Sequence, residues 1–295
     1  MSGNESGAVV VTGASTGIGR ATALLLDGKG YTVFAGVRKE ADEESLRQAG
    51  SARLTPLMID VAKHDTIDAA RKQVEEALDG QGLVGLVNNA GIGHGGPIEF
   101  TSVDDFREVL EVNVIGQVAV TQAFLSRIRM AKGTVVFVAS IGGRIASPFL
   151  SAYSVSKFGV EALGESLRRE VSPWGIDVTV IEPGSIATEI WRKADDLVSE
   201  QLDGMPQEGQ RLYRPQLESW AKAFIEGGKK TGIPPEKVAE VIHQAIRSDR
   251  PKARYLVGMD AKMGAKLNAA LPRRTFDRMV RMQYKQPKEP PAGAA

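Results

Sequence analysis

The stretch that decides the fold is Val9-Val10-Val11-Thr12-Gly13-Ala14-Ser15-Thr16-Gly17-Ile18-Gly19-Arg20, a β-branched run followed by a glycine-rich turn. A strand that passes directly into a helix needs glycine where the backbone takes a positive φ and where a Cβ would block an approaching phosphate. Gly13 and Gly17 meet these needs, and Gly19 lets the helix pack closely on the strand. Backbone N–H groups at the start of the helix then face a pyrophosphate, aided by the helix dipole. The turn therefore predicts a dinucleotide site with contacts from Gly13, Ser15, Thr16, Gly17, Ile18 and Gly19.

The same order of strand and then helix continues along the chain. Short apolar runs rich in β-branched residues occur at Ala8–Val11, Thr32–Val37, Leu54–Ile59, Leu83–Val87, Thr134–Val138, Val178–Ile181 and Tyr255–Val257. These runs are nearly continuous rather than alternating, which is typical of strands buried on both faces of a parallel sheet. Helical spacing occurs at Ala21–Leu26, Leu46–Ala49, Ile67–Leu78, Phe106–Ile128 and Tyr153–Val171. Right-handed crossovers then predict an α/β fold, a Rossmann-type doubly wound parallel sheet with helices on both faces.

The chain is expected to form one domain over residues 8–285, with disordered ends at 1–7 and 286–295. Residues 190–232 are too long for a simple connection and contain helix-like pieces, so we predict a helical cap over a substrate pocket. In residues 262–285, basic and apolar side chains are interleaved and Asp277 is the only acidic residue. That pattern predicts a basic helical segment that packs on its own domain or on a partner subunit. Peripheral contact with anionic lipid is the second interpretation.

Composition excludes several classes of protein. The 295 residues include 37 Lys and Arg against 36 Asp and Glu, a formal net charge of +1, whereas a protein that binds nucleic acid through its overall field needs a basic excess. The absence of cysteine excludes disulfides, thiolate metal sites and a cysteine nucleophile. The three histidines lack ligand spacing, so no metal site is predicted. Without an apolar run of about 18 residues or a secretion signal, we expect a soluble cytoplasmic protein with no membrane span.

Two candidate catalytic residues, Tyr153 and Lys157, are four positions apart in the sequence. Tyr153 and Lys157 therefore lie on one face of a predicted helix. A phenol titrates near ~10, too high for an efficient base at neutral pH, and a neighbouring ammonium lowers that pKa. Ser140 follows the predicted strand Thr134–Val138, at the sheet edge where ligands bind in open α/β folds. Asn113 stands inside an apolar helix, where its amide is unfavourable unless it is hydrogen-bonded.

The ordered set of motifs resembles the short-chain dehydrogenase/reductase family, densely over residues 9–188. The motifs are Thr12-Gly13-x3-Gly17-x-Gly19 after the first strand, Asp60-Val61 after the third, Asn88-Asn89-Ala90-Gly91 after the fourth, and Pro183-Gly184 with Ile186 and Thr188 after the sixth. The resemblance implies that Tyr153 is the general acid/base and that Ser140 donates to the substrate oxygen. It also implies that Lys157 modulates the tyrosine pKa and binds the ribose. Asn113 would hold a water of the proton relay, with a structural amide as the alternative.

The resemblance also places the cofactor. Asp60 and Val61 would contact the adenine. Further contacts would come from Asn89, Ala90, Gly91, Tyr153 and Lys157. The nicotinamide carboxamide would meet Pro183, Gly184, Ile186 and Thr188. The implied reaction is hydride transfer between nicotinamide and a carbonyl or alcohol carbon, with the proton exchanged by the tyrosine.

The end of the second predicted strand indicates which dinucleotide fits. An acidic residue there would accept a hydrogen bond from the ribose 2′-hydroxyl and repel a 2′-phosphate. The chain instead reads Val37-Arg38-Lys39, with two cations and no carboxylate. Arg38 is predicted to pair with a 2′-phosphate, which favours NADP(H) as the cofactor. Thr16 stands where some NADP-preferring relatives carry lysine or arginine, so NAD(H) is the alternative.

The segments 142–148 and 160–170, on either side of the tyrosine, look most like the retinol and hydroxysteroid dehydrogenase branch of the family. We therefore expect a lipophilic ketone or secondary alcohol as the small-molecule substrate, in contact with Ser140, Tyr153, Phe149 and Trp191. The alternatives are a catalytically silent dinucleotide-binding regulator and a reductase of acyl-carrier or small polar substrates. The intact set of four catalytic residues favours the enzyme. The resemblance also implies a homodimer or a homotetramer.

Overall fold

The computed structural model describes residues 7–187, 202 and 204–286 of the chain. Its centre is a single seven-stranded sheet in which all neighbouring strands are parallel, in the order β3-β2-β1-β4-β5-β6-β7. The strands are β1 (Ala8–Val11), β2 (Thr32–Val37), β3 (Leu54–Met58), β4 (Leu83–Asn88), β5 (Thr134–Val138), β6 (Asp177–Pro183) and β7 (Arg254–Val257). The predicted doubly wound sheet is confirmed. Strand order reverses between β1 and β4, and a crevice for ligands forms at such a reversal.

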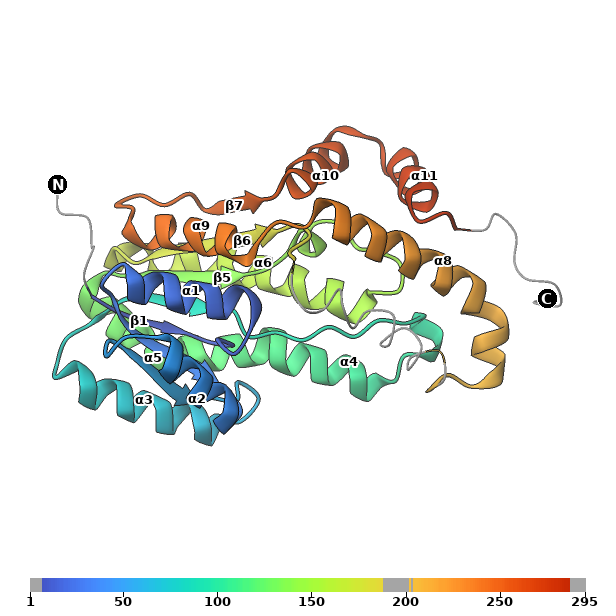
Figure 1. Cartoon of the computed structure of the whole chain (residues 1–295). Helices are drawn as coiled ribbons and strands as arrows, with labels where there is room; N and C mark the ends of the chain where they lie inside the picture. Colours follow the sequence, from blue (N-terminus) through green and yellow to red (C-terminus); the bar gives the residue numbers. More distant parts are fainter. Residues whose placement is uncertain (1–6, 188–201, 203, 287–295) are drawn as a thin grey trace.

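Helices cover both faces of the sheet (Figure 1). One face carries α1 (Gly17–Gly28), α2 (Glu40–Ala49) and α9 (Pro235–Arg247). The other carries α3 (His64–Leu78), α5 (Gly116–Ala131) and α6 (Ser151–Val171). Single 3₁₀ turns occur at Ile98–Phe100, Ile141–Gly143 and Ser172–Trp174. The helices predicted from spacing lie within these elements, with one exception.

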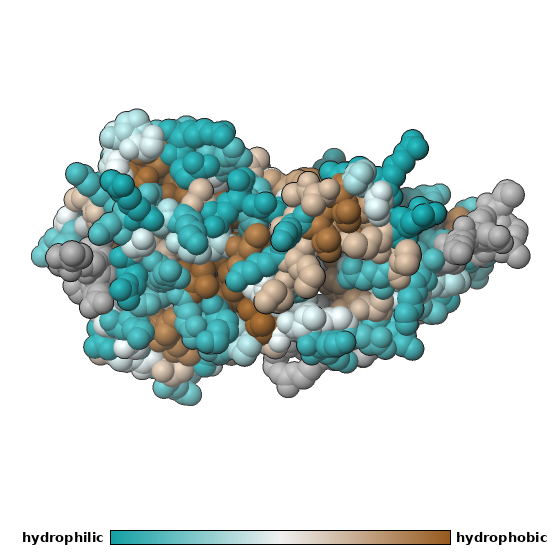
Figure 2. Space-filling view, turned by 90° about the horizontal axis from the view of Figure 1, so that it is seen from above, coloured by the Kyte–Doolittle hydropathy of each residue, from teal (hydrophilic) through white to brown (hydrophobic). Residues whose placement is uncertain are grey.

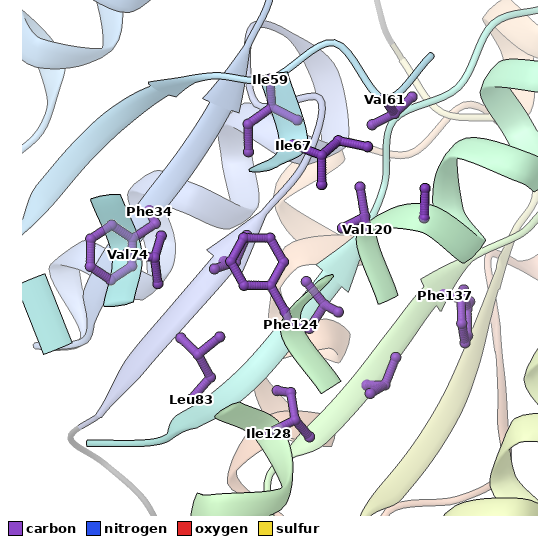
Figure 3. Close-up of a cluster of buried hydrophobic side chains, with 14 of the residues drawn as sticks. Phe34, Ile59, Val61, Ile67, Val74, Leu83, Val120, Phe124, Ile128 and Phe137 are labelled. Atoms are coloured by element: carbon purple, nitrogen blue, oxygen red, sulfur yellow. The ribbon is translucent and has the colours of Figure 1, made fainter. Parts of the chain in front are cut away.

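Alternation along the strands produces two cores. In β1, Val9 and Val11 point into the layer of α1 and α9, whereas Val10 points into the layer of α3 and α5. Figure 3 shows the second layer, where Phe34 of β2 and Phe124 of α5 lie among aliphatic side chains. Because both faces of the sheet are covered, most strands are nearly continuous runs of apolar residues, which is the pattern that the sequence displays.

The exception is the predicted helix Phe106–Ile128, which is not one regular α-helix. It consists of α4 (Val103–Leu110), a π-helical turn at Glu111–Ile115, and α5. Asn113 lies in the π-helical turn, and its hydrogen bonds to other parts of the chain account for the irregular register. π-Helical turns of this kind often occur at functional sites.

The run Val103–Ala131 is also the one helical stretch in the described residues that is long and apolar enough to cross a membrane, because it contains an 18-residue window with a mean hydropathy of 1.3. The sequence prediction of no membrane span did not anticipate this. Half of the apolar window is buried inside the fold, because Val120, Phe124 and Ile128 belong to the core. A core helix passes the same test, so the run is weak evidence for a membrane span.

Three helices of the C-terminal third, α8 (Gln207–Thr231), α10 (Met259–Ala270) and α11 (Arg273–Gln283), extend beyond the sheet (Figure 1). Of the predicted cap 190–232, residues 190–201 and 203 lie outside the described residues, and α8 is a single long helix. Gly209 does not break it, because this glycine is buried against the ring of Phe100. The predicted basic segment 262–285 is two helices, α10 and α11. Pro272 is the N-cap of α11, and Leu271 before it has the extended backbone that a following proline favours, so the two helices are separate.

The apolar side of α11 faces the protein itself. Phe276 is only 4% exposed, and the ring of Tyr284 lies 6.3 Å from that of Trp220 in α8. This packing agrees with the first interpretation of the basic segment. Of the ends expected to be disordered, residues 1–6 and 287–295 lie outside the described residues. Gly7 and Gln286, which the sequence placed in these ends, take part in backbone hydrogen bonds to Thr32 and Arg281.

Candidate active site

One cavity of about 1100 Å³ extends from the turn after β1 to the C-terminal helices. Its polar part lies at the carboxyl ends of the strands and is lined by Gly13, Ser15, Thr16, Asp60, Asn89, Ser140, Tyr153 and Lys157. Its apolar part is lined by Leu150, Phe224, Met263, Leu267, Phe276, Met279 and Val280. Figure 2, seen from the side of α9, α10 and α11, shows apolar side chains gathered between hydrophilic ones on this face of the molecule. The cavity therefore joins a polar floor to an apolar wall.

The glycine turn fits a dinucleotide phosphate group. Gly13 and Gly17 take φ values of +64° and +55°, and a Cβ on Gly13 would lie 2.8 Å from Ala90 Cα. A Cβ on Gly19 would overlap the carbonyl oxygen of Gly13. Thr16, the N-cap of α1, makes no side-chain capping hydrogen bond, and the first turn contains no acidic residue. The N–H groups of this turn are therefore available to an anion.

A cluster of hydrogen bonds holds the ends of β1 and β4 together. The Asn89 side chain donates to the carbonyl oxygens of Thr12 and Gly13, both at 3.0 Å. The Thr12 hydroxyl accepts from the backbone N–H groups of Asn89 and Ala90 at 3.0 and 3.1 Å. Asn89, Ala90 and Gly91 line the cavity beside this cluster, as do Asp60 and Val61 after β3. These predicted contact residues are thus brought to one place.

At the end of β2, Val37 is buried and Arg38 is exposed, and both line the cavity. The neighbouring Lys39 is exposed and is not among the lining residues. Ser15 lines the cavity opposite. Arg38 is thus the cation of this strand end that lines the cavity.

Ser140 and Tyr153 are hydrogen-bonded to each other. Burial raises the pKa of Tyr153, and the hydrogen bond from Ser140 lowers it. Lys157 donates from Nζ to the carbonyl oxygen of Val138 at 3.0 Å and lies 5.7 Å from the centroid of the Tyr153 ring. Burial lowers the pKa of the Lys157 ammonium to about 8. The predicted effect of Lys157 on the tyrosine pKa stays a prediction.

Asn113 is fully buried and its amide is satisfied by protein groups. Its oxygen accepts from the backbone N–H of Ile92 at 2.7 Å. Its nitrogen donates to the Ile92 carbonyl at 2.8 Å and to the Ser156 hydroxyl at 2.9 Å. These bonds support the structural interpretation of Asn113, and the water-holding role stays a prediction.

Pro183, Gly184 and Ile186 line the cavity after β6, whereas Thr188 lies outside the described residues. Asp260, at the start of α10, was missed by sequence reasoning. Its Oδ2 accepts from the backbone N–H of Ser185 at 2.7 Å, and its Oδ1 is buried without a partner in the described structure. Asp260 therefore holds the loop after β6 in place. The signal available in the sequence was a lone acidic residue two positions after Gly258.

Two aromatic residues, Phe149 and Trp191, were predicted to contact the substrate, and the structure describes one of them. Trp191 lies outside the described residues. Phe149 is not among the residues that line the cavity, because its ring packs edge-on against Tyr213 and Trp220, with centroids 6.5 and 5.8 Å away. Its φ of +62° turns the side chain into this cap cluster. The next residue, Leu150, lines the cavity instead.

Comparison with known proteins identifies the family. A sequence model of the family described as short chain dehydrogenase matches residues 7–198. Retinol dehydrogenase 16 of Mus musculus is 38% identical over 259 residues, which covers 86% of this chain and 81% of that protein. The chain belongs to the short-chain dehydrogenase family. The 17-beta-hydroxysteroid dehydrogenase type 6 of Bos taurus is 36% identical with the same coverage, which supports the predicted branch of this family.

Solved structures agree with the fold of this dehydrogenase. A short-chain dehydrogenase from Streptomyces avermitilis superposes with a TM-score of 0.72 at 26% identity, covering 95% of this chain and 97% of that one. A short chain dehydrogenase from Burkholderia cenocepacia, solved in complex with NADP, superposes with a TM-score of 0.70 at 22% identity. It covers 96% of this chain and 98% of that one.

Family membership makes this chain an oxidoreductase acting on CH–OH donors. A bound nicotinamide dinucleotide supplies the hydride chemistry of such an enzyme. The chain itself supplies the half-buried phenol Tyr153, which lines the cavity and is hydrogen-bonded to Ser140. An oxygen that replaces their mutual hydrogen bond can accept hydrogen bonds from both hydroxyls and exchange a proton with the phenol. The individual catalytic roles stay predictions.

The buried ammonium of Lys157 predicts how stability depends on pH in the ligand-free enzyme. Its pKa is lowered to about 8 from 10.5, so between these values the unfolded chain binds more protons than the folded one. The free energy of unfolding should therefore rise with pH in this interval, by up to about 1.4 kcal/mol per pH unit from this group. Lys157→Met should lack this contribution. Urea denaturation of both proteins at pH 8.0, 8.5, 9.0 and 9.5, values taken from about this interval, measures the difference in slope.

Lys222→Met, which changes an exposed lysine of α8, is the control and should keep the wild-type slope. Equal slopes for the wild type and Lys157→Met would contradict a buried ammonium at this position.

Proposed function

We propose that this dehydrogenase transfers hydride between NADP(H) and a lipophilic ketone or secondary alcohol. The observation that carries the proposal is the apolar wall beside Tyr153. Phe224 of α8, Leu267 of α10 and Val280 of α11 all line the cavity into which the Tyr153 side chain faces. An apolar wall of this kind gains free energy by excluding water around an apolar substrate. The relatives named above as retinol and hydroxysteroid dehydrogenases are consistent with this substrate class.

The alternatives carried from the sequence are less favoured. A catalytically silent regulator would not need a tyrosine hydroxyl bonded to a serine beside the dinucleotide turn. A small polar substrate would leave the apolar wall exposed to water. The preference for NADP(H) rests on Arg38 at the cavity rim and on the absence of a carboxylate at the end of β2. A guanidinium there can bind a 2′-phosphate through charge-assisted hydrogen bonds.

The substrate and cofactor are tested together. With NADPH, the purified protein should reduce the steroid ketone 5α-androstan-3-one with a higher kcat/KM than acetoacetate.

Val37→Asp combined with Arg38→Leu removes the partner of the 2′-phosphate and adds a repulsive carboxylate, so kcat/KM for NADPH should fall by about one to two decades. The value for NADH should rise modestly, because the carboxylate accepts the free ribose hydroxyl.

Lys39→Leu removes the neighbouring cation that does not line the cavity, so it should keep the wild-type cofactor preference. A wild type that prefers NADH would contradict the cofactor assignment. A wild type that prefers acetoacetate would contradict the substrate class.

We further propose that two copies of the chain associate through the exposed face formed by α6 and the π-helical turn at Glu111–Ile115. Ile115, Val155 and Phe158 are 47%, 49% and 45% exposed, which is unusual for large apolar side chains outside an interface. Sedimentation equilibrium should give the mass of a dimer or tetramer, and Phe158→Glu should shift it toward that of the monomer. Met130→Glu, at the C-terminal end of α5, is the control. A monomeric wild type would contradict this proposal.

A further inference from the structure

We infer that Ser147 and Tyr284 form a second polar subsite, which binds a non-reacting oxygen atom of the lipophilic substrate. The inference rests on the proposed function, because it concerns the part of the cavity that the apolar wall encloses. Both residues line the cavity. They are separate from the pair Ser140 and Tyr153, at which the reacting oxygen would bind.

Three elements build this subsite. Ser147 lies in the segment before α6, and its hydroxyl accepts a hydrogen bond from Trp220 Nε1 of α8 at 3.1 Å. Tyr284 follows α11, and its hydroxyl is hydrogen-bonded to Ser147. The Ser219 hydroxyl of α8 bonds to the backbone carbonyls of Tyr284 and Lys285 at 3.2 and 3.0 Å, which fixes the end of α11. The two hydroxyls are therefore held in place before any substrate binds.

The polar hydrogens of the subsite determine whether it can donate a hydrogen bond to a substrate. Trp220, Ser147 and Tyr284 contribute one polar hydrogen each, from an indole N–H and two hydroxyls. The indole hydrogen goes to Ser147, and one hydroxyl hydrogen joins Ser147 to Tyr284. Whichever hydroxyl donates in that bond, the other hydroxyl hydrogen has no partner within the group of three. The subsite thus presents one O–H donor, which suits a carbonyl or hydroxyl oxygen.

The apolar surroundings of this O–H donor make the subsite favour a substrate that carries an oxygen atom at this position. The neighbouring lining residues Leu150, Phe224 and Phe276 are apolar, and a polar hydrogen in such a wall is costly unless it is bonded. Burial also raises the pKa of Tyr284, so its hydroxyl keeps the proton. A site built to bond a substrate oxygen disfavours an analogue that lacks it. The subsite therefore favours lipophilic substrates with two oxygen functions over those with one.

Tyr213 provides a matched comparison within the same cap. It is a tyrosine of α8 whose ring packs against Phe149 in the aromatic cluster. Its hydroxyl bonds to Glu99 Oε2 at 2.7 Å, and it is not among the residues that line the cavity. Loss of this hydroxyl should affect cap packing without affecting a substrate oxygen.

The test uses two steroid ketones with NADPH as the reductant. One is 17β-hydroxy-5α-androstan-3-one, and the other is 5α-androstan-3-one, which lacks the second oxygen. The wild type should show a kcat/KM roughly three- to tenfold higher for the hydroxylated ketone, the range expected for one hydrogen bond. Tyr284→Phe should bring the ratio of the two values close to one, and Tyr213→Phe should keep the wild-type ratio. Ser147→Ala, which removes the partner of Tyr284, should also lower the ratio.

Each outcome has a distinct meaning. A wild-type ratio near one overturns the subsite while leaving the proposed function in place, since both ketones are still reduced. Equal loss of the ratio in Tyr284→Phe and Tyr213→Phe also overturns it, because the effect would then come from cap packing. If neither ketone is reduced, the proposed lipophilic substrate class fails and the subsite fails with it. Thermal melting of each variant verifies that it is folded.

Discussion

The site depends on the close approach of β1 and β4 at their carboxyl ends. Asn89 and Thr12 tie the two strands together through backbone and side-chain hydrogen bonds, and Gly13 fits between them because a Cβ would lie 2.8 Å from Ala90 Cα. This tie sets the start of α1, where open N–H groups face the cavity. The sheet places β5, and hence Ser140, beside it. The phosphate turn and the tyrosine–serine pair thus share one cavity.

The C-terminal helices α10 and α11 form the substrate end of the cavity, next to the part that would hold the dinucleotide. Asp260 anchors α10 to the loop after β6, and Tyr284 anchors the end of α11 near Trp220 of the cap. Both helices contribute apolar lining residues. The same segment therefore supports the loop next to the predicted nicotinamide position and completes the apolar wall.

Much of this could be predicted from the sequence, because strands buried on both faces must be apolar and the turn after β1 must contain glycine at fixed positions. Local patterns could not show the π-helical turn at Asn113, whose register depends on bonds to Ile92 from another part of the chain. Nor could they show that Gly209 continues a helix because it packs on Phe100, or that Phe149 turns away into the cap. Asp260 was missed for the same reason, since its partner Ser185 is distant in sequence. Tertiary contacts decide each of these cases.

The central claim is that Tyr153 exchanges the proton of the reaction beside a bound dinucleotide. The direct measurement is kcat for NADPH-dependent reduction of 5α-androstan-3-one by the wild type and Tyr153→Phe, together with the Kd for NADPH of each. Removing the hydroxyl while keeping the ring should lower kcat by roughly 100-fold or more, because general acid–base catalysis is worth about that much. The Kd should change little, since the ring still fills its place in the cavity. A variant that keeps the wild-type kcat would contradict the claim.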